Sequence, residues 1–207
     1  MTTTSRTNEQ RGVGLASTVD RVIPGAGSTL DTVSDHLQGT LRRAFSGPVG
    51  RRVATALRGN EWLGHPVHPI VVTVPIGAWM TAAWFDLRGR RDRSDQRTAD
   101  NVLLVGVVAA VPAALTGVIQ FLDTSGQARR ETAVHWALNN LAVALNIASL
   151  AVRSAGGRRW GRRLSAAALL VVGVSGFLGG DLTYRLRVGA MADRDDSSAW
   201  RGAPVQR

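Results

Sequence analysis

Three of the four histidines in this chain border long apolar segments, where an imidazole can bind a metal ion or a haem iron. His65 and His68 stand in the string Gly-His-Pro-Val-His-Pro just before one apolar segment, and His135 lies at the start of another. We take His68 and His135 as the preferred ligand pair, with His65 as a further candidate for the same cofactor site. A haem or a metal ion is the cofactor this pair would hold, and a quinone is the alternative.

Each of the first two histidines precedes a proline, whose ring disfavours helical geometry in the residue before it. We therefore expect His65 and His68 in extended backbone, with His68 as the helix cap and Pro69 as the first helical residue. In a polyproline-like segment, residues three apart project to one side about 9 Å apart, so these two imidazoles would suit a single metal ion poorly. The alternative is that both simply contact headgroups, water or loop carbonyls.

Other polar side chains accompany the histidines. Gln120 joins the candidates for cofactor binding, and Asp123 and Asp181 are candidate oxygen ligands of a metal bound with His68 and His135. Polar residues also repeat at spacings of four and three along one face of the segment that follows His135, and such a face should turn toward protein or a water-filled cavity. This polar seam comprises His135, Asn139, Ala142, Asn146 and Ser149.

Four apolar segments would position these side chains, at about residues 69–87, 101–122, 132–152 and 164–182. Each is close to the roughly 20 residues that a membrane-spanning helix needs. The sequence therefore predicts an all-α integral membrane four-helix bundle. If consecutive spans alternate in direction, the starts of the first and third meet the ends of the second and fourth at one face. That face would gather His65, His68, Gln120, Asp123, His135 and Asp181.

Three further features bear on packing and on the class of membrane protein. Gly173, Gly176 and Gly180 in the fourth span are expected to lie against another helix, because glycine permits close backbone approach. Asp86 and Asp100, at the other end of the bundle, are expected to pair with arginines of the connections. Four spans without an internal repeat give little support to a small transporter.

The charge pattern predicts an orientation. The net charge is +10 and the pI about 11.7, but arginines concentrate in the first and third connections, with only Arg129 and Arg130 in the second. By the positive-inside rule, the first and third connections are cytoplasmic and both termini are extracytoplasmic. Because basic loops beside apolar spans already have this membrane explanation, we exclude nucleic acid as a partner. The chain contains no cysteine, which excludes disulfides and cysteine-ligated clusters within it.

The chain divides into four parts. Residues 1–28 are a polar tail that we expect to be disordered, and residues 191–207 form a polar C-terminal tail. Residues 29–59 form two short amphipathic stretches that either lie in the lipid interface or serve as linker helices. Residues 60–190 form the four-span membrane domain.

Several strings resemble a known family. "WLGHPVHPIVVTVPIGAW" from Trp62 to Trp79, "HWALNN" from His135 and "GGDLTYRLRVG" from Gly179 are similar to the bacterial uncharacterised membrane proteins grouped as domain of unknown function 2231. The resemblance implies a four-helix inner-membrane domain, joined in some relatives to a Rieske-type iron-sulfur domain that this chain lacks. The resemblance implies that His often takes the place held here by Asp181, so one candidate ligand for a haem is missing from this chain.

Two functions remain open from the sequence, since no nucleophile elbow, P-loop or zinc-protease helix is present and enzyme activity stays undecided. The first is a redox-associated module that binds haem, metal or quinone at an outer-face histidine cluster. The second is a structural membrane subunit or anchor for a partner protein, without a cofactor. The expected partners are the lipid bilayer and a membrane or redox protein, and a homo-oligomer stays open.

Overall fold

The computed structural model describes residues 27–89 and 92–189, and this part of the chain is helical without strands. The helices are α2 (Gly27–Ala44), α3 (Pro48–Arg58), α4 (His68–Val71), α5 (Thr73–Arg88), α6 (Arg93–Leu122), α7 (Gly126–Ser154) and α8 (Arg158–Tyr184). The all-α prediction is confirmed. The predicted tails lie outside the described residues, apart from residues 27 and 28, which begin α2.

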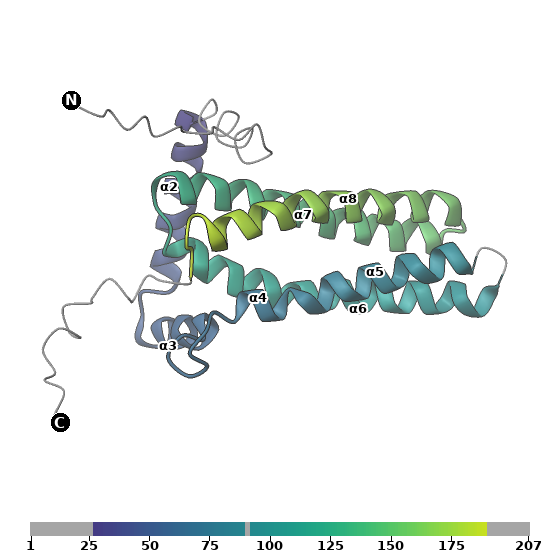
Figure 1. Ribbon diagram of the computed structural model, residues 1–207, viewed down its shortest axis with the longest axis horizontal. Coiled ribbons are helices and arrows are strands. Elements are labelled where there is room, and N and C mark those ends of the chain that lie inside the picture. Colours follow the sequence, from purple (N-terminus) through teal and green to yellow (C-terminus); the bar gives the residue numbers. More distant parts are fainter. Residues whose placement is uncertain (1–26, 90–91, 190–207) are drawn as a thin grey trace, which may run out of the picture.

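Two antiparallel hairpins form the bundle (Figure 1). In one, α4 and α5 run beside α6, and in the other α7 runs beside α8. The hairpins meet where α6 contacts α7 and α5 contacts α8, so α5 and α7 lie diagonally across the bundle axis. We call the end where α4 and α7 begin the histidine end, and the end where α5 and α7 finish the arginine end.

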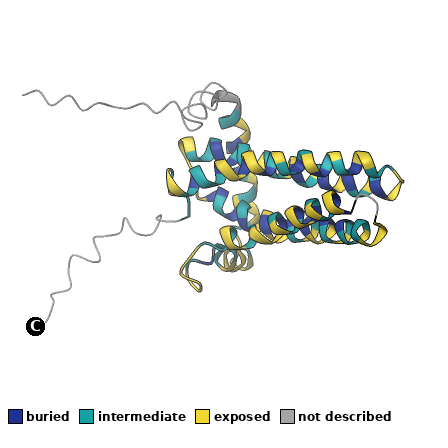
Figure 2. Cartoon of the chain, turned by 45° about the vertical axis from the view of Figure 1, so that its right-hand side comes forward, coloured by how far each residue is buried: buried dark blue, intermediate teal, exposed yellow. Residues whose placement is uncertain are grey.

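Within the described residues, four helical segments are long and apolar enough to cross a membrane: His68–Arg88, Arg93–Leu122, Gly126–Ser154 and Arg158–Tyr184. Their exposed side chains are largely apolar. Met80, Val108, Ile147, Leu170 and Val174 are all more than half exposed. Figure 2 shows the exposed residues along the outside of both hairpins and the buried ones between the helices. An outer surface of this kind belongs against lipid, so the membrane prediction is confirmed.

Local signals explain where the helices begin and end. The Asp92 side chain caps α6 by accepting a hydrogen bond from the backbone N–H of Ser94 at 2.8 Å. Gly59 ends α3 with a φ of 84°, a left-handed conformation that favours glycine. The first span is divided at Val72, three residues before Pro75, because proline has no N–H to continue the helical hydrogen bonds.

The expected role of His68 as an extended helix cap is wrong. Val67 precedes α4 with helical angles of −73° and −35°, and His68 is the first residue of the helix. Pro69 therefore takes the second position of α4. The first turn tolerates proline, because the N–H that it lacks has no partner within the helix there.

The two hairpins repeat one pattern of buried positions. His68 and His135 are 67 positions apart, and the buried residues of α5 have buried counterparts in α7 at the same spacing. Buried residues of α6 have buried counterparts in α8 at a second constant spacing. The expectation of no internal repeat is therefore wrong, since equivalent faces of the two hairpins line the axis. The matching pairs are Pro75 and Ala142, Trp79 and Asn146, Ala82 and Ser149, Asp86 and Arg153, then Ala99 and Gly161, Leu103 and Ser165, Gly106 and Ala168, Ala110 and Val172, Ala113 and Ser175, and Thr116 and Leu178.

The glycine face of α8 is oriented differently from the prediction. A Cβ atom built on Gly173, Gly176 or Gly180 meets nothing within 4 Å in the described part of the chain. These three glycines therefore do not pack against another helix of the bundle. The core instead uses small residues at other positions, with Ala82, Ala142 and Ala168 almost fully buried.

Both N-terminal amphipathic stretches form helices that dock on the histidine end. Gln38 of α2 donates to the backbone oxygens of Phe121 and Thr124 at 2.7 and 3.0 Å, which satisfies carbonyls at the end of α6. Ala54 of α3 packs with Ile119 and Leu122 of α6. The helices are therefore attached directly to the bundle by polar and apolar contacts.

Candidate cofactor site

His68 and His135 meet at the bundle axis. Their ring centroids are 6.5 Å apart and the ring planes stand at 83°, an edge-to-face arrangement. One ring comes from α4 and the other from α7, so the contact joins the two hairpins. The sequence-based choice of these two histidines as a pair thus matches residues that the fold brings together.

The His68 ring is fixed against α6. Its Nδ1 atom lies 3.0 Å from the Ala113 carbonyl oxygen and 3.1 Å from the Thr116 hydroxyl, so Nδ1 carries a proton and donates. The ring also rests on Gly117, where a Cβ atom would come within 2.9 Å of Cε1. Among the described residues, Nε2 of His68 has no hydrogen-bond partner, and its lone pair is left available.

The His135 ring is fixed against α8 in the same manner. Its Nδ1 donates to the Ser175 carbonyl oxygen at 2.8 Å, and the ring rests on Gly179, where a Cβ atom would lie 3.1 Å from Cε1. On the other side, Nε2 accepts a hydrogen bond from the Asn139 side-chain amide at 2.9 Å. Both histidines therefore hold the Nδ1–H form, with Nε2 as the basic nitrogen.

The internal repeat explains why the two rings are held alike. Ala113 and Ser175 are equivalent positions, and Gly117 and Gly179 each follow four residues later. Each hairpin thus supplies a carbonyl that orients one imidazole and a glycine that makes room for it. A backbone carbonyl on Nδ1 is the usual outer partner of a histidine that binds metal through Nε2.

The other predicted site residues lie apart from this pair. Asp123 forms two hydrogen bonds of 2.7 Å with Arg58 of α3, and Asp181 pairs with Arg185 one turn later. His65 is exposed in the loop before α4. The Gln120 amide lies beside Gly189, where a built Cβ atom would be 3.0 Å from Nε2.

No group of three or more histidine, cysteine, aspartate or glutamate side chains in the described residues could hold a metal ion. The carboxylates nearest the histidine end are instead paired with arginines, which compete for their oxygens. The donor set at the axis is therefore two imidazole nitrogens, supplied symmetrically by the two hairpins.

The arginine end contains a separate buried charge network. The Arg153 guanidinium pairs with Asp86 and donates to Asp100 at 2.9 Å, and Arg158 donates to Asp100 at 2.8 Å. Only 2% of the Arg153 side chain is exposed. The expectation that both aspartates pair with arginines is confirmed, and the network closes this end of the bundle.

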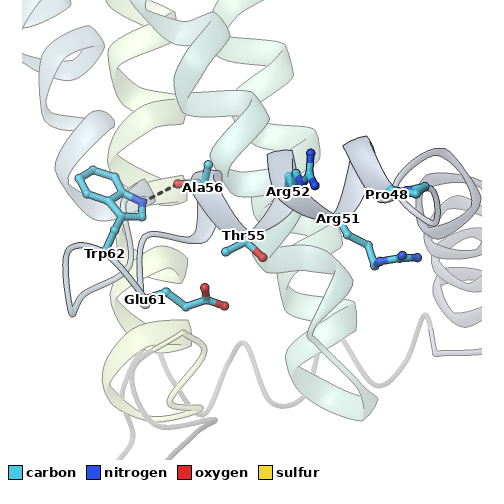
Figure 3. Close-up of a pocket in the computed structure, with 7 residues that line it drawn as sticks. All are labelled: Pro48, Arg51, Arg52, Thr55, Ala56, Glu61 and Trp62. Atoms are coloured by element: carbon cyan, nitrogen blue, oxygen red, sulfur yellow. Dashed lines mark hydrogen bonds between the residues drawn. The ribbon is translucent and has the colours of Figure 1, made fainter.

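A surface hollow of about 580 Å³ lies between α3 and the loop that follows it, with Arg51, Arg52 and Trp62 in its lining (Figure 3). Its seven lining residues all belong to this N-terminal region and include neither histidine of the axial pair. The hollow is therefore a different feature from the histidine site.

Two sequence signals for the site were missed. Gly117 lies within an apolar span and looks like an ordinary packing residue, and Gly179 looks like part of a glycine-rich stretch. Both glycines hold equivalent places in the pattern of buried positions shared by α6 and α8, and that pattern is visible in the structure rather than in the sequence.

The fold and the inward histidines define a four-span integral membrane protein with a polar site at one end of its axis. The chain belongs to the family described as predicted membrane protein, domain of unknown function 2231, which matches residues 64–192. That range includes all four spans. No curated protein and no solved structure matches the chain.

Proposed function

We propose that this protein is a membrane redox module in which His68 and His135 supply both axial ligands of one haem. The observation that carries the proposal is the pair itself: two inward imidazoles from different hairpins, each oriented by a backbone carbonyl on Nδ1. The two rings approach each other across the axis, with their centroids 6.5 Å apart.

The donor set favours haem over a bare metal ion. A metal ion held by protein alone usually needs three or four side-chain ligands, whereas a haem brings four equatorial nitrogens and needs only the axial positions filled. At the bundle axis the described residues offer two imidazoles, and nowhere do they offer a group of three potential ligands. A site with two strong donors therefore fits the needs of haem best.

A haem held by both imidazoles would supply electron transfer rather than oxygen activation. We therefore propose that the module passes electrons between the membrane and a partner protein at the histidine end. The bound haem would supply the electron-carrying iron. The protein would orient the two imidazoles, exclude lipid from their Nε2 atoms and keep both in the Nδ1–H form.

Binding requires two local changes. The rings lie in edge-to-face contact, so the hairpins must separate at this end to admit the porphyrin. Asn139 must also rotate away from Nε2 of His135. Both changes occur at the end of the bundle, while the ion pairs of the arginine end continue to hold the hairpins together.

Haem quantification of purified variants tests the proposal. Protein produced with added haem precursor should carry about one haem per chain, and His68→Ala and His135→Ala should each lose it. His65→Ala is the matched control, because His65 is exposed and lies only three residues before His68. Retention of full haem content by either axial variant would contradict the assignment.

The second function, a structural subunit without a cofactor, is favoured by one observation. Both nitrogens of His135 already have protein partners, and Ser175 donates from its hydroxyl to the Asn139 oxygen at 3.0 Å. A network of this kind can join helices in a membrane without any ligand. In that case His135→Ala lowers thermal stability in haem-free protein, and no variant of the pair changes haem content.

A further inference from the structure

Asn146 lies in the middle of α7 and is fully buried, with 0% of its surface exposed. Neither its side-chain oxygen nor its side-chain nitrogen has a hydrogen-bond partner in the described part of the chain. A primary amide can make up to four hydrogen bonds, and burying it without any is costly. Buried polar groups in proteins are almost always satisfied, by protein or by ordered water.

A second orphaned group occurs at the equivalent position of the other hairpin. The indole N–H of Trp79, in α5, is buried and also has no partner among the described residues. Trp79 follows His68 by eleven residues, and Asn146 follows His135 by eleven residues. The two unpaired groups therefore lie at matching depths, about 16 Å of helix from the histidines.

The contacts toward the histidine end and toward the arginine end indicate that Trp79 and Asn146 both lie on the side of their helices that faces the bundle axis. At the histidine end the equivalent residues His68 and His135 touch, and at the arginine end the equivalent residues Asp86 and Arg153 form an ion pair. Trp79 and Asn146 stand between these two contacts on the same diagonal helices. The same helical register places both residues on the face toward the bundle axis, and the Trp79 indole nitrogen lies against α6, where a Cβ atom built on Gly106 would come within 2.4 Å of Nε1.

We propose that ordered water occupies the axis between Trp79 and Asn146, near the middle of the membrane. Water accepts from the indole N–H and both donates to and accepts from the Asn146 amide, which satisfies groups that no described residue satisfies. The neighbouring positions are small, with Ala82 and Ser149 one turn toward the arginine end.

An apolar layer separates this water from the histidine site. Ala110, Ala142 and Val172 are buried between the two levels and belong to the main core. On the other side, Ser149 follows Asn146 by less than one turn and accepts a hydrogen bond from Arg153 at 3.0 Å. The hydrated site therefore connects to the polar network of the arginine end and is sealed from His68 and His135.

Nuclear magnetic resonance of protein in lipid nanodiscs, with ¹⁵N-labelled tryptophan, tests this inference. The indole N–H of Trp79 should show magnetisation transfer from water with the sign of a bound molecule. Trp84 of the same helix is 62% exposed toward lipid and should show none. Trp79→Phe assigns the signal.

Variants of α7 complete the test. Asn146→Leu should abolish the water signal at Trp79, whereas Asn140→Leu, on the exposed face of the same helix, should preserve it. Absence of the signal in the unsubstituted protein would overturn the proposal, as would its persistence in Asn146→Leu. If Asn146→Leu fails to fold, the unsubstituted protein alone decides, because a dry axis gives no water transfer to Trp79. A small organic molecule retained at one per chain in native mass spectrometry, and lost in Asn146→Leu, would also contradict water as the occupant.

Discussion

His68 and His135 lie edge to face across the bundle axis, with ring centroids 6.5 Å apart, although 67 positions separate them in the chain. Each ring is oriented by its own hairpin, through a carbonyl of α6 for one and of α8 for the other. The contact is therefore a product of the internal repeat. A site built in this way from two equivalent halves offers a symmetric pair of ligands.

The glycines beneath the two rings should be essential to the site. Gly117→Ala places a methyl group 2.9 Å from Cε1 of His68, which forces the ring to shift. We expect this variant to lose most bound haem and to be destabilised by about 1 to 3 kcal/mol through overpacking. Haem content and thermal unfolding in detergent measure both effects.

Gly176→Ala is the control for that experiment. A Cβ atom at Gly176 meets nothing within 4 Å among the described residues, and the residue lies on the same helix as Gly179. Its haem content and melting temperature should equal those of the unsubstituted protein. Equal effects of Gly117→Ala and Gly176→Ala would show that the ring contact is not the cause.

The buried ion pair at the arginine end should dominate the stability of the bundle. Asp86→Asn leaves Arg153 buried with one carboxylate partner fewer, and breaking a buried pair typically costs about 3 to 5 kcal/mol. The double variant Asp86→Leu with Arg153→Met removes both charges and should cost much less than the sum of the single changes. Unfolding in detergent, measured as a double-mutant cycle, tests this, and additive effects would count against a coupled pair.

The orientation predicted from arginine distribution can be tested by cysteine labelling, because the chain has no native cysteine. Cysteines placed at Ser94 or Ser154, both exposed at the arginine end, should resist an impermeant reagent in intact cells. A cysteine at Ser125, exposed at the histidine end, should react. The opposite pattern would mean that the histidine end is cytoplasmic.

The docking of α2 should depend on pH. Hydrogen bonds from Arg130 to Asp31, at 2.8 and 2.6 Å, lower the pKa of Asp31 below its ordinary value of 3.8. A depressed carboxyl pKa contributes stability above pH 3.8 that is lost as the pH falls through the lower folded value. Proteolysis within α2 should therefore be faster in Asp31→Asn than in the unsubstituted protein at pH 7. That difference should vanish below the folded pKa, and a constant difference at all pH values would contradict the assignment.

The spans and the histidine pair could be predicted because the signals are local. Twenty apolar residues define a span wherever they occur, and alternating spans must bring His68 and His135 to the same end. The helical spacing of the polar seam also placed Asn146 and Ser149 on the buried side of α7, as the structure has them. These inferences need only helix periodicity and topology.

The remaining features depend on contacts that no local pattern encodes. Asp123 was a candidate metal ligand, but α3 docks so that Arg58 binds its carboxylate. Gly176 was expected to face a helix, but the rotation of α8 turns Gly179 toward His135 instead. A helix that rotates by one residue position turns a different side inward. That rotation is set by the packing of the whole bundle.

The central claim is that His68 and His135 bind one haem, and an optical spectrum of the purified protein tests it most directly. The protein should be produced with added haem precursor, purified in detergent, and measured oxidised and then reduced. We predict the spectrum of a six-coordinate, low-spin haem at about one per chain, reversible on reoxidation, and absent from His68→Ala and His135→Ala. A purified, folded protein without a haem spectrum under these conditions would contradict the account.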